Sequence, residues 1–416
     1  DLYRDDNDLL SHDQTIVYAT HDSIGHLGIF VSASVGRKEH REFAANIGII
    51  DLLPPGIYRA EVEDLILGCG APGGEQGGNL GRVVAVLAGL PSVPGTTITR
   101  FCSSSLQSTR MAFHAIRAGE GDVFVSAGVE SASRLDRGAS DEDTRNPAFR
   151  SAWERSARRA EGDAPVWTDP AEEGELPDVY IAMGQTAENV AQLRGVSRQA
   201  QDEYAVRSQQ LTEKSQASGF WDREISPLVL PDGIRVTRDD SPRAGTTLEA
   251  VSQLNPVFRP DGTVTAGNAC PLNDGAAALV VMSDTRAAEL GLTPLARIVS
   301  TGLSALSPEI MGLGPVEASR QALARAGMSI DDVDLVEINE AFAAQVLPSA
   351  EDLGIPLDKL NVNGGAIALG HPWGMTGARI TATLLNSLRE HDKHIGLETM
   401  CVGGGQGMAM VIERLS

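Results

Sequence analysis

The sequence predicts an α/β fold, because short apolar segments typical of strands alternate with longer segments whose apolar residues recur at helical spacing. Two pairs of segments also echo each other. Residues 62–66 resemble residues 333–337, and the helix and strand predicted after Cys102 resemble those predicted between His371 and Cys401. A duplicated βα unit would explain both echoes, and the sequence by itself leaves this duplication open.

The alternation is clear in the first third of the chain. Leu106, Met111, Ala112 and Ile116 fall at helical spacing, and the short β-branched run before Cys102 is typical of a strand. In chain order, the predicted elements are strand 15–19, strand 61–68, a Gly-rich turn at 70–78, helix 79–90, strand 96–99, helix 104–118 and buried strand 122–128.

The middle of the chain changes character before the alternation returns. Residues 131–174 are rich in Arg, Asp, Glu and Ala with little periodicity, which predicts a solvated insertion. Residues 181–250 add helices and turns. The C-terminal strands and helices are then predicted at 276–282, 295–300, 315–326, 333–338, 376–388, 396–401 and 408–413.

Composition limits the classes of function. The 416 residues are 42% hydrophobic and 22% charged, enough for two packed units. The formal net charge of −22 argues against nucleic acid or a membrane surface as a general partner, although a few Arg residues and helix N-termini can still bind an anionic ligand. No apolar run reaches the roughly 18 residues that a membrane span requires.

The four cysteines are Cys69, Cys102, Cys270 and Cys401. None belongs to a C-x-x-C pair, so the sequence predicts neither a zinc site nor a thioredoxin-like motif, and no metal is expected. A chain of this length does not need disulfides, and the acidic N-terminus lacks the pattern of a signal peptide. We therefore expect reduced thiols and a cytoplasmic protein.

Four short motifs place reactive side chains on turns of small residues. They span residues 100–105, 339–342, 370–372 and 401–405. Acyl transfer through a cysteine needs this set of groups: a nucleophile, a base, donors for the oxyanion and a second acid or base. Each motif also has a plainer interpretation when taken alone, namely an inert buried cysteine, a turn histidine, a phosphate-binding loop or a helix N-terminus.

The positions of two of these side chains favour chemistry. Cys102 lies where a predicted strand meets a predicted helix, and a helix N-terminus favours the thiolate and lowers the thiol pKa. His371 follows a Gly-rich stretch that allows the backbone to approach another group closely. A histidine beside a cysteine can take its proton.

Together these motifs resemble those of the thiolases, the acetyl-CoA acetyltransferase and 3-ketoacyl-CoA thiolase family. The resemblance runs from about residue 61 to residue 416. It implies a thiolase fold, in which two similar α/β halves form a layered αβαβα core with an inserted loop domain. The implied boundaries are residues 1–128 and 252–292 for the N-terminal half, 129–251 for the loop domain and 293–416 for the C-terminal half.

The resemblance also implies catalytic roles. Cys102 would be the nucleophile and His371 its base, with the ring N–H of His371 helping to stabilise an enolate oxygen. Cys401 would move the α-proton of acetyl-CoA. Asn339 would hold a catalytic water, and the N–H of Gly403 would join that of Cys102 in the acyl oxyanion hole.

Contacts to coenzyme A follow from the same resemblance. Met183 and Met311 would line the pantetheine channel, Arg243 would lie near the adenine and phosphate end, and Phe342 would close the acyl pocket. Cys270 stands where many relatives carry a pantetheine-binding Ser, and a thiol is a weaker donor. Acyl-CoA would be a substrate, no cofactor would be tightly bound, and the chain would form a homodimer or homotetramer.

The sequence departs from the family pattern in two places. Ser104 and Ser105 occupy a turn that commonly holds Gly after the nucleophile, and the first 60 residues match poorly. Residues 20–25 stand in place of the usual Arg- and Pro-containing turn. The role of Glu340 is open, since it could tune His371 or cap a helix.

The predicted function is the reversible condensation of acetyl-CoA with an acyl-CoA, with acetyl-CoA C-acetyltransferase activity in fatty acid metabolism as the first expectation. Broad-chain 3-ketoacyl-CoA thiolysis in β-oxidation is an alternative, and a non-catalytic acyl-CoA-binding subunit is another. A ketosynthase is disfavoured, because Cys401 stands where that class needs a second His or an Asn.

Overall fold

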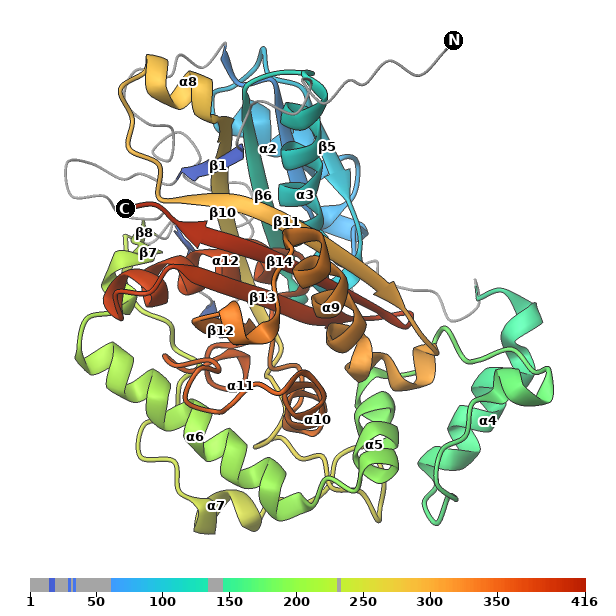
Figure 1. Cartoon of the computed structure of the whole chain (residues 1–416). Coiled ribbons are helices and arrows are strands. Elements are labelled where there is room, and N and C mark those ends of the chain that lie inside the picture. The colour runs from blue at the N-terminus through green and yellow to red at the C-terminus, as the bar shows by residue number, and fades with distance from the viewer. Residues whose placement is uncertain (1–14, 19–28, 31–32, 35–60, 134–144, 230–232) are drawn as a thin grey trace.

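Strands of the first and last thirds of the chain pair in the same pattern in the computed structural model (Figure 1). The structure describes residues 15–18, 29–30, 33–34, 61–133, 145–229 and 233–416. The atypical N-terminal stretch, including residues 20–25, lies outside the described residues, apart from three short strands. These strands are β1 (Thr15–Tyr18), β2 (Ile29–Phe30) and β3 (Ala33–Ser34).

The first repeat lies mainly between residues 64 and 131 and is completed by a strand far along the chain. Its elements are β4 (Asp64–Gly68), α2 (Leu80–Leu87), β5 (Gly95–Ile98), α3 (Ser104–Ala118), β6 (Val123–Ser131), β10 (Asn273–Ser283) and α8 (Asp284–Glu289). The second repeat comprises β11 (Ala296–Ala305), α9 (Gly314–Ala326), β12 (Leu335–Ile338), α10 (Ala343–Leu353), α11 (Ala366–Leu369), α12 (Trp373–Glu390), β13 (Ile395–Val402) and β14 (Gln406–Arg414).

The strand pairing shows the duplication that the sequence by itself left open. In the first repeat, β4 runs parallel to β6, and β6, β10 and β1 follow in antiparallel order. In the second, β12 runs parallel to β13, and β13, β14 and β11 follow in antiparallel order. Antiparallel pairing of β1 with β11 joins the two repeats.

Alternation along the strands builds the layers. On β10, Leu279 and Val281 face a core shared with α3 and α12, whereas Ala278 and Val280 face the cluster beside α2. Strands of the second repeat alternate in the same way between this central core and a cluster beside α9 and α10. The order is therefore helix, sheet, helices α3 and α12, sheet, helix.

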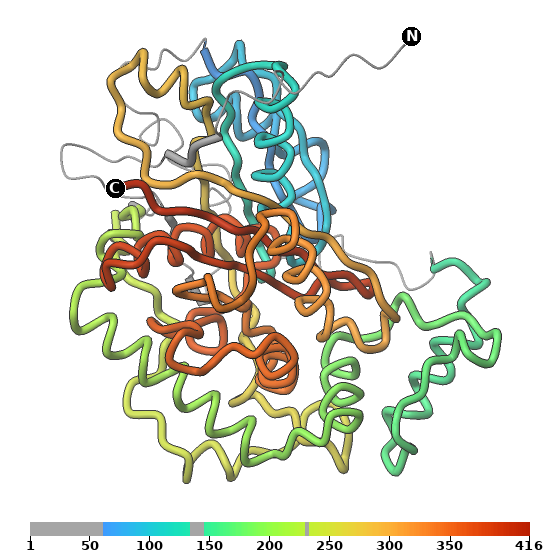
Figure 2. Tube along the Cα trace, in the orientation of Figure 1, coloured from blue at the N-terminus to red at the C-terminus, as the bar shows by residue number. Residues whose placement is uncertain are grey.

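The segment between the repeats forms helices and short strands. They are α4 (Arg150–Ala160), α5 (Met183–Arg194), α6 (Arg198–Ala217), β7 (Ile225–Ser226), β8 (Leu228–Val229), β9 (Arg235–Val236) and α7 (Leu248–Ser252). In Figure 2 this green and yellow part of the trace lies along one end of the sheets, with α4 set off to one side. The domain boundaries given above stay a prediction.

The two longest helices that periodicity missed are α4 and α10. α4 buries little beyond Ala152 and Ser156, so an apolar stripe is absent, and it is tied down instead by an ion pair from Arg155 to the buried Glu309 (2.8 Å). α10 contains Pro348, which weakens a helical pattern, but it is held by burial on most of its faces.

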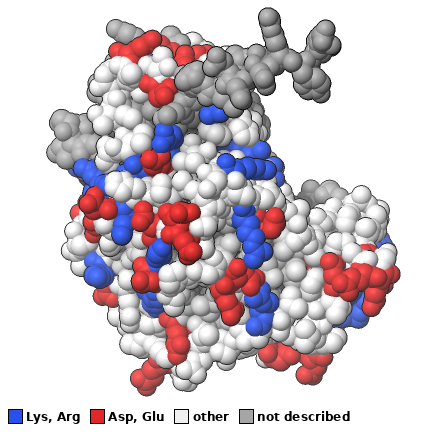
Figure 3. Space-filling model, viewed as in Figure 1, with Lys and Arg blue, Asp and Glu red and all other residues white. Residues whose placement is uncertain are grey.

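Charge is mixed rather than segregated on the face shown in Figure 3, where Lys and Arg lie among Asp and Glu. Among the described residues, no helix is long and apolar enough to cross a membrane. In the same part of the chain, no group of three His, Cys, Asp or Glu side chains could hold a metal ion.

Candidate active site

Cys102 lies on a tight turn between β5 and α3. The turn is the single 3-10 turn Phe101–Ser103, and Phe101 adopts a left-handed φ of 43°. The Ser104 hydroxyl donates to Phe101 O (2.6 Å) and accepts from the backbone N–H of Arg100 (2.9 Å), which fixes the turn. The side chain of Cys102 is buried, with 7% of its surface exposed.

The serines in place of the usual glycines are built into the packing. Ser105 Oγ accepts from the backbone N–H of Ala378 on α12 (2.9 Å), so it links the two central helices. Gly68 at the end of β4 allows this first turn of α3 to approach closely, since a Cβ there would overlap the backbone of Ser104 and Ser105. The close approach therefore requires a glycine on the facing strand, at Gly68.

His371 is buried just before α12, and its ring is held at both nitrogens. Nδ1 contacts Thr376 Oγ1 (2.7 Å), and the Thr376 hydroxyl donates to Pro372 O (2.9 Å). Because that hydroxyl proton is already committed, His371 donates through Nδ1–H and keeps a lone pair on Nε2. Nε2 accepts from Asn339 Nδ2 (3.2 Å).

Asn339 leaves β12 beside β13, where its backbone N–H donates to Thr399 O (3.0 Å). Its side-chain Oδ1 is buried and has no hydrogen-bond partner among the described residues. A buried amide oxygen without a partner is costly, so this atom suits a small donor such as water. Asn339 and Glu340 lie between β12 and α10 and do not cap the helix, whose N-cap is Phe342.

Cys401 and Gly403 lie at the hairpin between β13 and β14. The N–H groups of Gly403 and Cys102 donate toward the Cys102 thiol and lower its pKa. Burial raises the pKa of the thiols of Cys401 and Cys270, and the charge of an ionised Cys102 raises both further, so the three sulfurs share one site. The turn Phe101–Ser103 packs against α12 and β13, which brings the His371 segment to the same place.

Burial dominates the pKa values in this site. It raises the pKa of Cys102 to about 11 despite the two N–H donors. The expectation of a lowered pKa for this thiol was therefore wrong for the net value, because desolvation outweighs the N–H groups that lower it. Burial and the charge of Arg379 lower the pKa of His371 to about 3. The resting pair is a neutral thiol and a neutral imidazole.

The predicted pantetheine and acyl residues gather around Cys401. Met311 and Phe342 are buried in one apolar cluster with Cys401, and Met183 packs against its edge. Met183 also lies next to Gly403, since a Cβ on that glycine would be 3.6 Å from the methionine sulfur. Phe258 stacks edge-on against Phe342, with ring centroids 6.1 Å apart.

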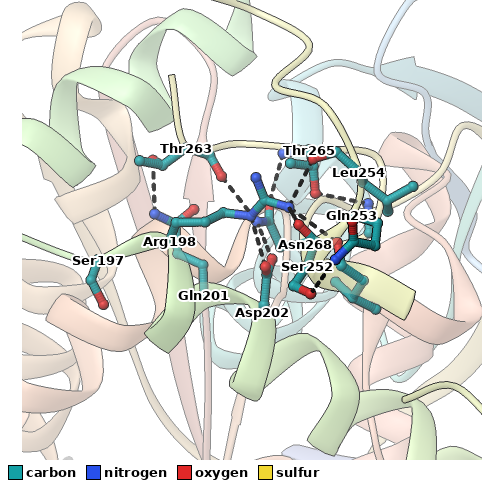
Figure 4. A network of polar contacts seen from close by, with 12 residues as sticks. Ser197, Arg198, Gln201, Asp202, Ser252, Gln253, Leu254, Thr263, Thr265 and Asn268 are labelled. Atoms are coloured by element: carbon teal, nitrogen blue, oxygen red, sulfur yellow. Dashed lines mark hydrogen bonds and ion pairs between the residues drawn. The ribbon is translucent and has the colours of Figure 1, made fainter. Parts of the chain in front are cut away.

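A polar network joins α6 to Asn268, which lies two residues before Cys270 (Figure 4). Asn268 donates to Asp202 Oδ1 (2.9 Å), and Arg198 donates to Asp202 Oδ2 (2.7 Å). The backbone N–H of Cys270 donates to Ala341 O (3.0 Å), next to Phe342. The network therefore holds the segment that carries Cys270 against the apolar cluster of Cys401.

Arg243 is exposed and lines a cleft of about 350 Å³ together with Gln209, Gly267 and Pro271. Because Gly267 and Pro271 flank Cys270, this segment leads from the cleft to the thiols. Arg243 itself is exposed at this cleft, whereas Cys102, His371 and Cys401 are buried. A second cleft, of about 430 Å³, lies beside α4 and contains none of the predicted site residues.

Known proteins share this architecture. Residues 31–285 match the family described as "Thiolase, N-terminal domain", and residues 292–414 match "Thiolase, C-terminal domain". This chain belongs to the thiolase family. The fold and the class of enzyme predicted from the sequence, a thiolase acyltransferase, are confirmed.

Relatives of this thiolase carry several names. A 3-oxoadipyl-CoA/3-oxo-5,6-dehydrosuberyl-CoA thiolase of Escherichia coli is 44% identical over 371 residues, covering 85% of this chain and 88% of that protein. An acetyl-CoA acetyltransferase of Cupriavidus necator is 42% identical over 409 residues, covering 97% and 99%. The crystal structure of the Bacillus anthracis acetyl-CoA acetyltransferase superposes with a TM-score of 0.80 at 35% identity, covering 97% of this chain and 100% of that one.

Sequence reasoning missed two supporting residues of this thiolase, Thr376 and Glu130, and left the role of a third, Glu340, open. Thr376 orients His371, and Glu130 accepts from the N–H of Gly374 at the start of α12 (2.8 Å) and from Gly70 N–H (2.6 Å). Glu130 stands within an otherwise apolar strand, which was a signal for a buried structural acid. Glu340 accepts from Tyr204 (2.9 Å), Ser208 (2.6 Å) and the backbone N–H of Ile367 in α11 (3.1 Å), so its bonds serve packing and do not reach His371.

Proposed function

We propose that this thiolase is an acetyl-CoA C-acetyltransferase that works through an acyl-enzyme on Cys102. The observation that carries the proposal is the Cys102 thiol, which faces two backbone N–H donors in the site that it shares with Cys401. Fixed backbone donors suit an oxyanion, because they are in place before the charge develops. His371 and Asn339 supply the base and the amide that this chemistry also needs.

In the first half-reaction, His371 Nε2 takes the proton of the Cys102 thiol, and the thiolate attacks the thioester carbonyl of acetyl-CoA. The N–H groups of Cys102 and Gly403 bind the oxyanion. When the intermediate collapses, the C–S bond to CoA breaks and the leaving thiolate takes a proton from Cys401. The products are acetyl-Cys102, free CoA, a Cys401 thiolate and a protonated His371.

In the second half-reaction, the Cys401 thiolate removes the α-proton of a second acetyl-CoA. The N–H on Nε2 of His371 and a water held by Asn339 stabilise the enolate oxygen, and Asn339 Oδ1 is the buried acceptor that fits this water. The carbanion attacks acetyl-Cys102. The Cys102 thiolate leaves and recovers its proton from His371, which restores both residues; the reverse sequence gives thiolysis.

The neutral resting pair fits this cycle. A thiol with a pKa of about 11 and an imidazole with a pKa of about 3 exchange a proton unfavourably in the free enzyme. The oxyanion-binding N–H groups and the incoming carbonyl therefore carry much of the driving force for attack. Catalysis is then concentrated in the complex with acyl-CoA.

A short acyl chain is supported by the packing around Cys401. Met311 is 1% exposed and Phe342 is 7% exposed, and Phe258 backs Phe342. A long chain would have to displace these side chains. For coenzyme A, we propose that Arg243 binds a phosphate in the cleft and that Met183 and Cys270 border the pantetheine arm.

The test is CoA-dependent thiolysis of acetoacetyl-CoA beside 3-ketodecanoyl-CoA, with Cys102→Ala as the control. Activity confined to the short substrate supports the proposal. Comparable activity on the long substrate would make the chain a broad-chain 3-ketoacyl-CoA thiolase, a name that several relatives carry. Wild-type turnover equal to that of Cys102→Ala on both substrates would refute the enzyme proposal in favour of an acyl-CoA-binding subunit.

We propose further that the chain forms a homodimer or homotetramer. β5 ends the sheet order, and its outer edge has no strand partner among the described residues. The neighbouring helix α2 exposes Val83, Val86 and Leu87 at 43%, 48% and 52%. An open edge beside an apolar helix face is suited to pairing with a second copy. A monomer by light scattering at micromolar concentration would refute this.

The remaining expectations are also proposals. A cytoplasmic location is supported by four free cysteines in the structure, and fractionation of cells tests it. That no cofactor is tightly bound is tested by native mass spectrometry of the purified protein, where a mass above that of the chain would contradict it.

A further inference from the structure

The loop that carries Gly403 consists of glycines whose backbone can rotate easily, whereas the proposed oxyanion hole needs a fixed donor. Gly403, Gly404 and Gly405 connect β13 to β14, and the last two adopt left-handed φ values of 77° and 76°. Glycine peptides rotate easily because no Cβ restricts them. An oxyanion donor must be held still, since its effect depends on orientation before the reaction.

One end of this loop is fixed by backbone packing. Gly405 O accepts from the N–H of Leu306 (2.8 Å), and a Cβ on Gly405 or Gly407 would overlap the backbone of the adjoining segment that leads into α9. Gly403 is different, because the nearest atoms to a Cβ there are side-chain atoms of Phe101 at 3.4 Å. Backbone contacts therefore fix the far end of the loop and, through the pairing of Val402 with Gln406, the residue before Gly403, whereas Gly403 itself is surrounded by side chains.

The side chain of Gln406 reaches back to the oxyanion end. Its Nε2 donates to Gly403 O (3.3 Å), and its Oε1 accepts from Arg100 Nη1 (2.7 Å). The Arg100 bond is charge-assisted and short, so it decides which way the Gln406 amide faces. With Oε1 directed at Arg100, the NH₂ group is directed at Gly403.

Arg100 is well placed to give this orientation. It is half-buried, it immediately precedes Phe101 and Cys102, and its Nε donates to Gln107 Oε1 on α3 (3.1 Å). Among the described residues, it forms no ion pair with a carboxylate, so its guanidinium is shared between two amide oxygens. Arg100 and Gln406 are 306 residues apart in sequence, and their bond joins the nucleophile turn to the glycine loop.

We propose that Gln406, oriented by Arg100, is a positioning residue that holds the Gly403–Gly404 peptide and so restricts rotation at Gly403, whose N–H, in the preceding peptide, binds the acyl oxyanion on Cys102. The inference rests on the proposed acyl-enzyme on Cys102. Gln406 does not touch the reacting atoms. It acts through the carbonyl of Gly403, while Arg100 keeps the amide facing the loop and ties it to the turn that carries the thiol.

The test compares two substitutions at Gln406 with a matched control. Gln406→Leu removes both bonds, and Gln406→Glu keeps an acceptor for Arg100 but loses the donor to Gly403 O. Gln107→Leu removes only the other bond of Arg100 and leaves Gln406 in place. Folding is checked by circular dichroism and thermal unfolding, and Gln406→Glu keeps the test decisive if Gln406→Leu misfolds.

Two rates distinguish a loss of oxyanion positioning from a general disruption of the site around Cys102. One is the single-turnover release of CoA when acetyl-CoA acylates the enzyme, and the other is alkylation by iodoacetamide, which forms no oxyanion. We expect both Gln406 variants to acylate roughly 10–100-fold more slowly, with KM changed by less than about threefold and alkylation slowed by less than about fivefold. Gln107→Leu should stay within about threefold of wild type in all three.

Each possible outcome either supports or overturns the role proposed for Gln406. A selective loss of acylation in the Gln406 variants supports the inference. Unchanged acylation, or acylation and alkylation slowed equally, overturns it while leaving the proposed function intact. A wild-type protein that releases no CoA from acetyl-CoA refutes the proposed acyl-enzyme and, with it, the role given to Gln406.

Discussion

Removing the hydroxyl of Thr376 is the most direct way to perturb His371, the proposed base. It accepts from His371 Nδ1 (2.7 Å) in a fully buried site, so it selects the tautomer whose Nε2 lone pair can take the Cys102 proton. Thr376→Val keeps the shape of the side chain and removes this acceptor. Pro372 O stays satisfied, because it also accepts from the backbone N–H of Met375 (2.9 Å).

The expected magnitude follows from one lost hydrogen bond. Such a bond is worth about 1–1.5 kcal/mol to the correct tautomer, and about 1.4 kcal/mol corresponds to tenfold in rate. We therefore expect kcat/KM for acetoacetyl-CoA thiolysis to fall roughly 5–13-fold. The unpaired Nδ1–H should also lower the free energy of unfolding by about 1–3 kcal/mol.

The assay is steady-state thiolysis beside denaturant unfolding, with Thr376→Ser as the matched control. Ser keeps the hydroxyl and should keep kcat/KM within about threefold of wild type, although it loses a buried methyl group. A Thr376→Val enzyme with wild-type kcat/KM would refute the reasoning that this hydroxyl sets the tautomer of His371.

Three further predictions follow from buried groups. Burial raises the pKa of Glu398 to about 8 from 4.5, so its proton stabilises the fold at low pH. The free energy of unfolding therefore falls as the pH rises toward 8. Glu398→Gln should reduce this fall by about 4 kcal/mol in unfolding titrations between pH 5 and pH 8.5. Gly68→Ala should displace the first turn of α3 and lower both Tm and kcat, whereas an unchanged Tm would contradict the close approach. Cys401→Ala should still be acetylated on Cys102 when CoA release is followed, but should form no acetoacetyl-CoA by chromatography; product formed at the wild-type rate would remove Cys401 from the proton transfer.

Much of the fold was accessible from sequence because the strands are short, apolar and separated by clear helices. The weak echo between residues 62–66 and 333–337 corresponds to β4 and β12, which hold equivalent places in the two repeats. The helix α4 was not accessible, because it is held by the long-range ion pair between Arg155 and Glu309 and has no apolar stripe.

Motifs pointed to Cys102, His371, Asn339 and Cys401, and the structure brings these four side chains into one region, but their electrostatics were not predictable. A helix N-terminus argued for a low pKa of Cys102, and only the packing around it reveals that burial outweighs the dipole. Thr376 and Gln406 act through contacts that no spacing encodes. The bond from Arg100 to Gln406 spans 306 residues, so its role becomes visible only once the chain is folded.

The most direct test of the account is to find where acetyl-CoA leaves its acetyl group. The protein is incubated with acetyl-CoA, quenched in acid, digested and analysed by mass spectrometry, with Cys102→Ala and Cys401→Ala in parallel. The account predicts one acetyl thioester on the peptide that contains Cys102, present in Cys401→Ala and absent in Cys102→Ala. An acetyl group on Cys401 or Cys270 with Cys102 unmodified, or no acetylation of the wild type, would contradict it.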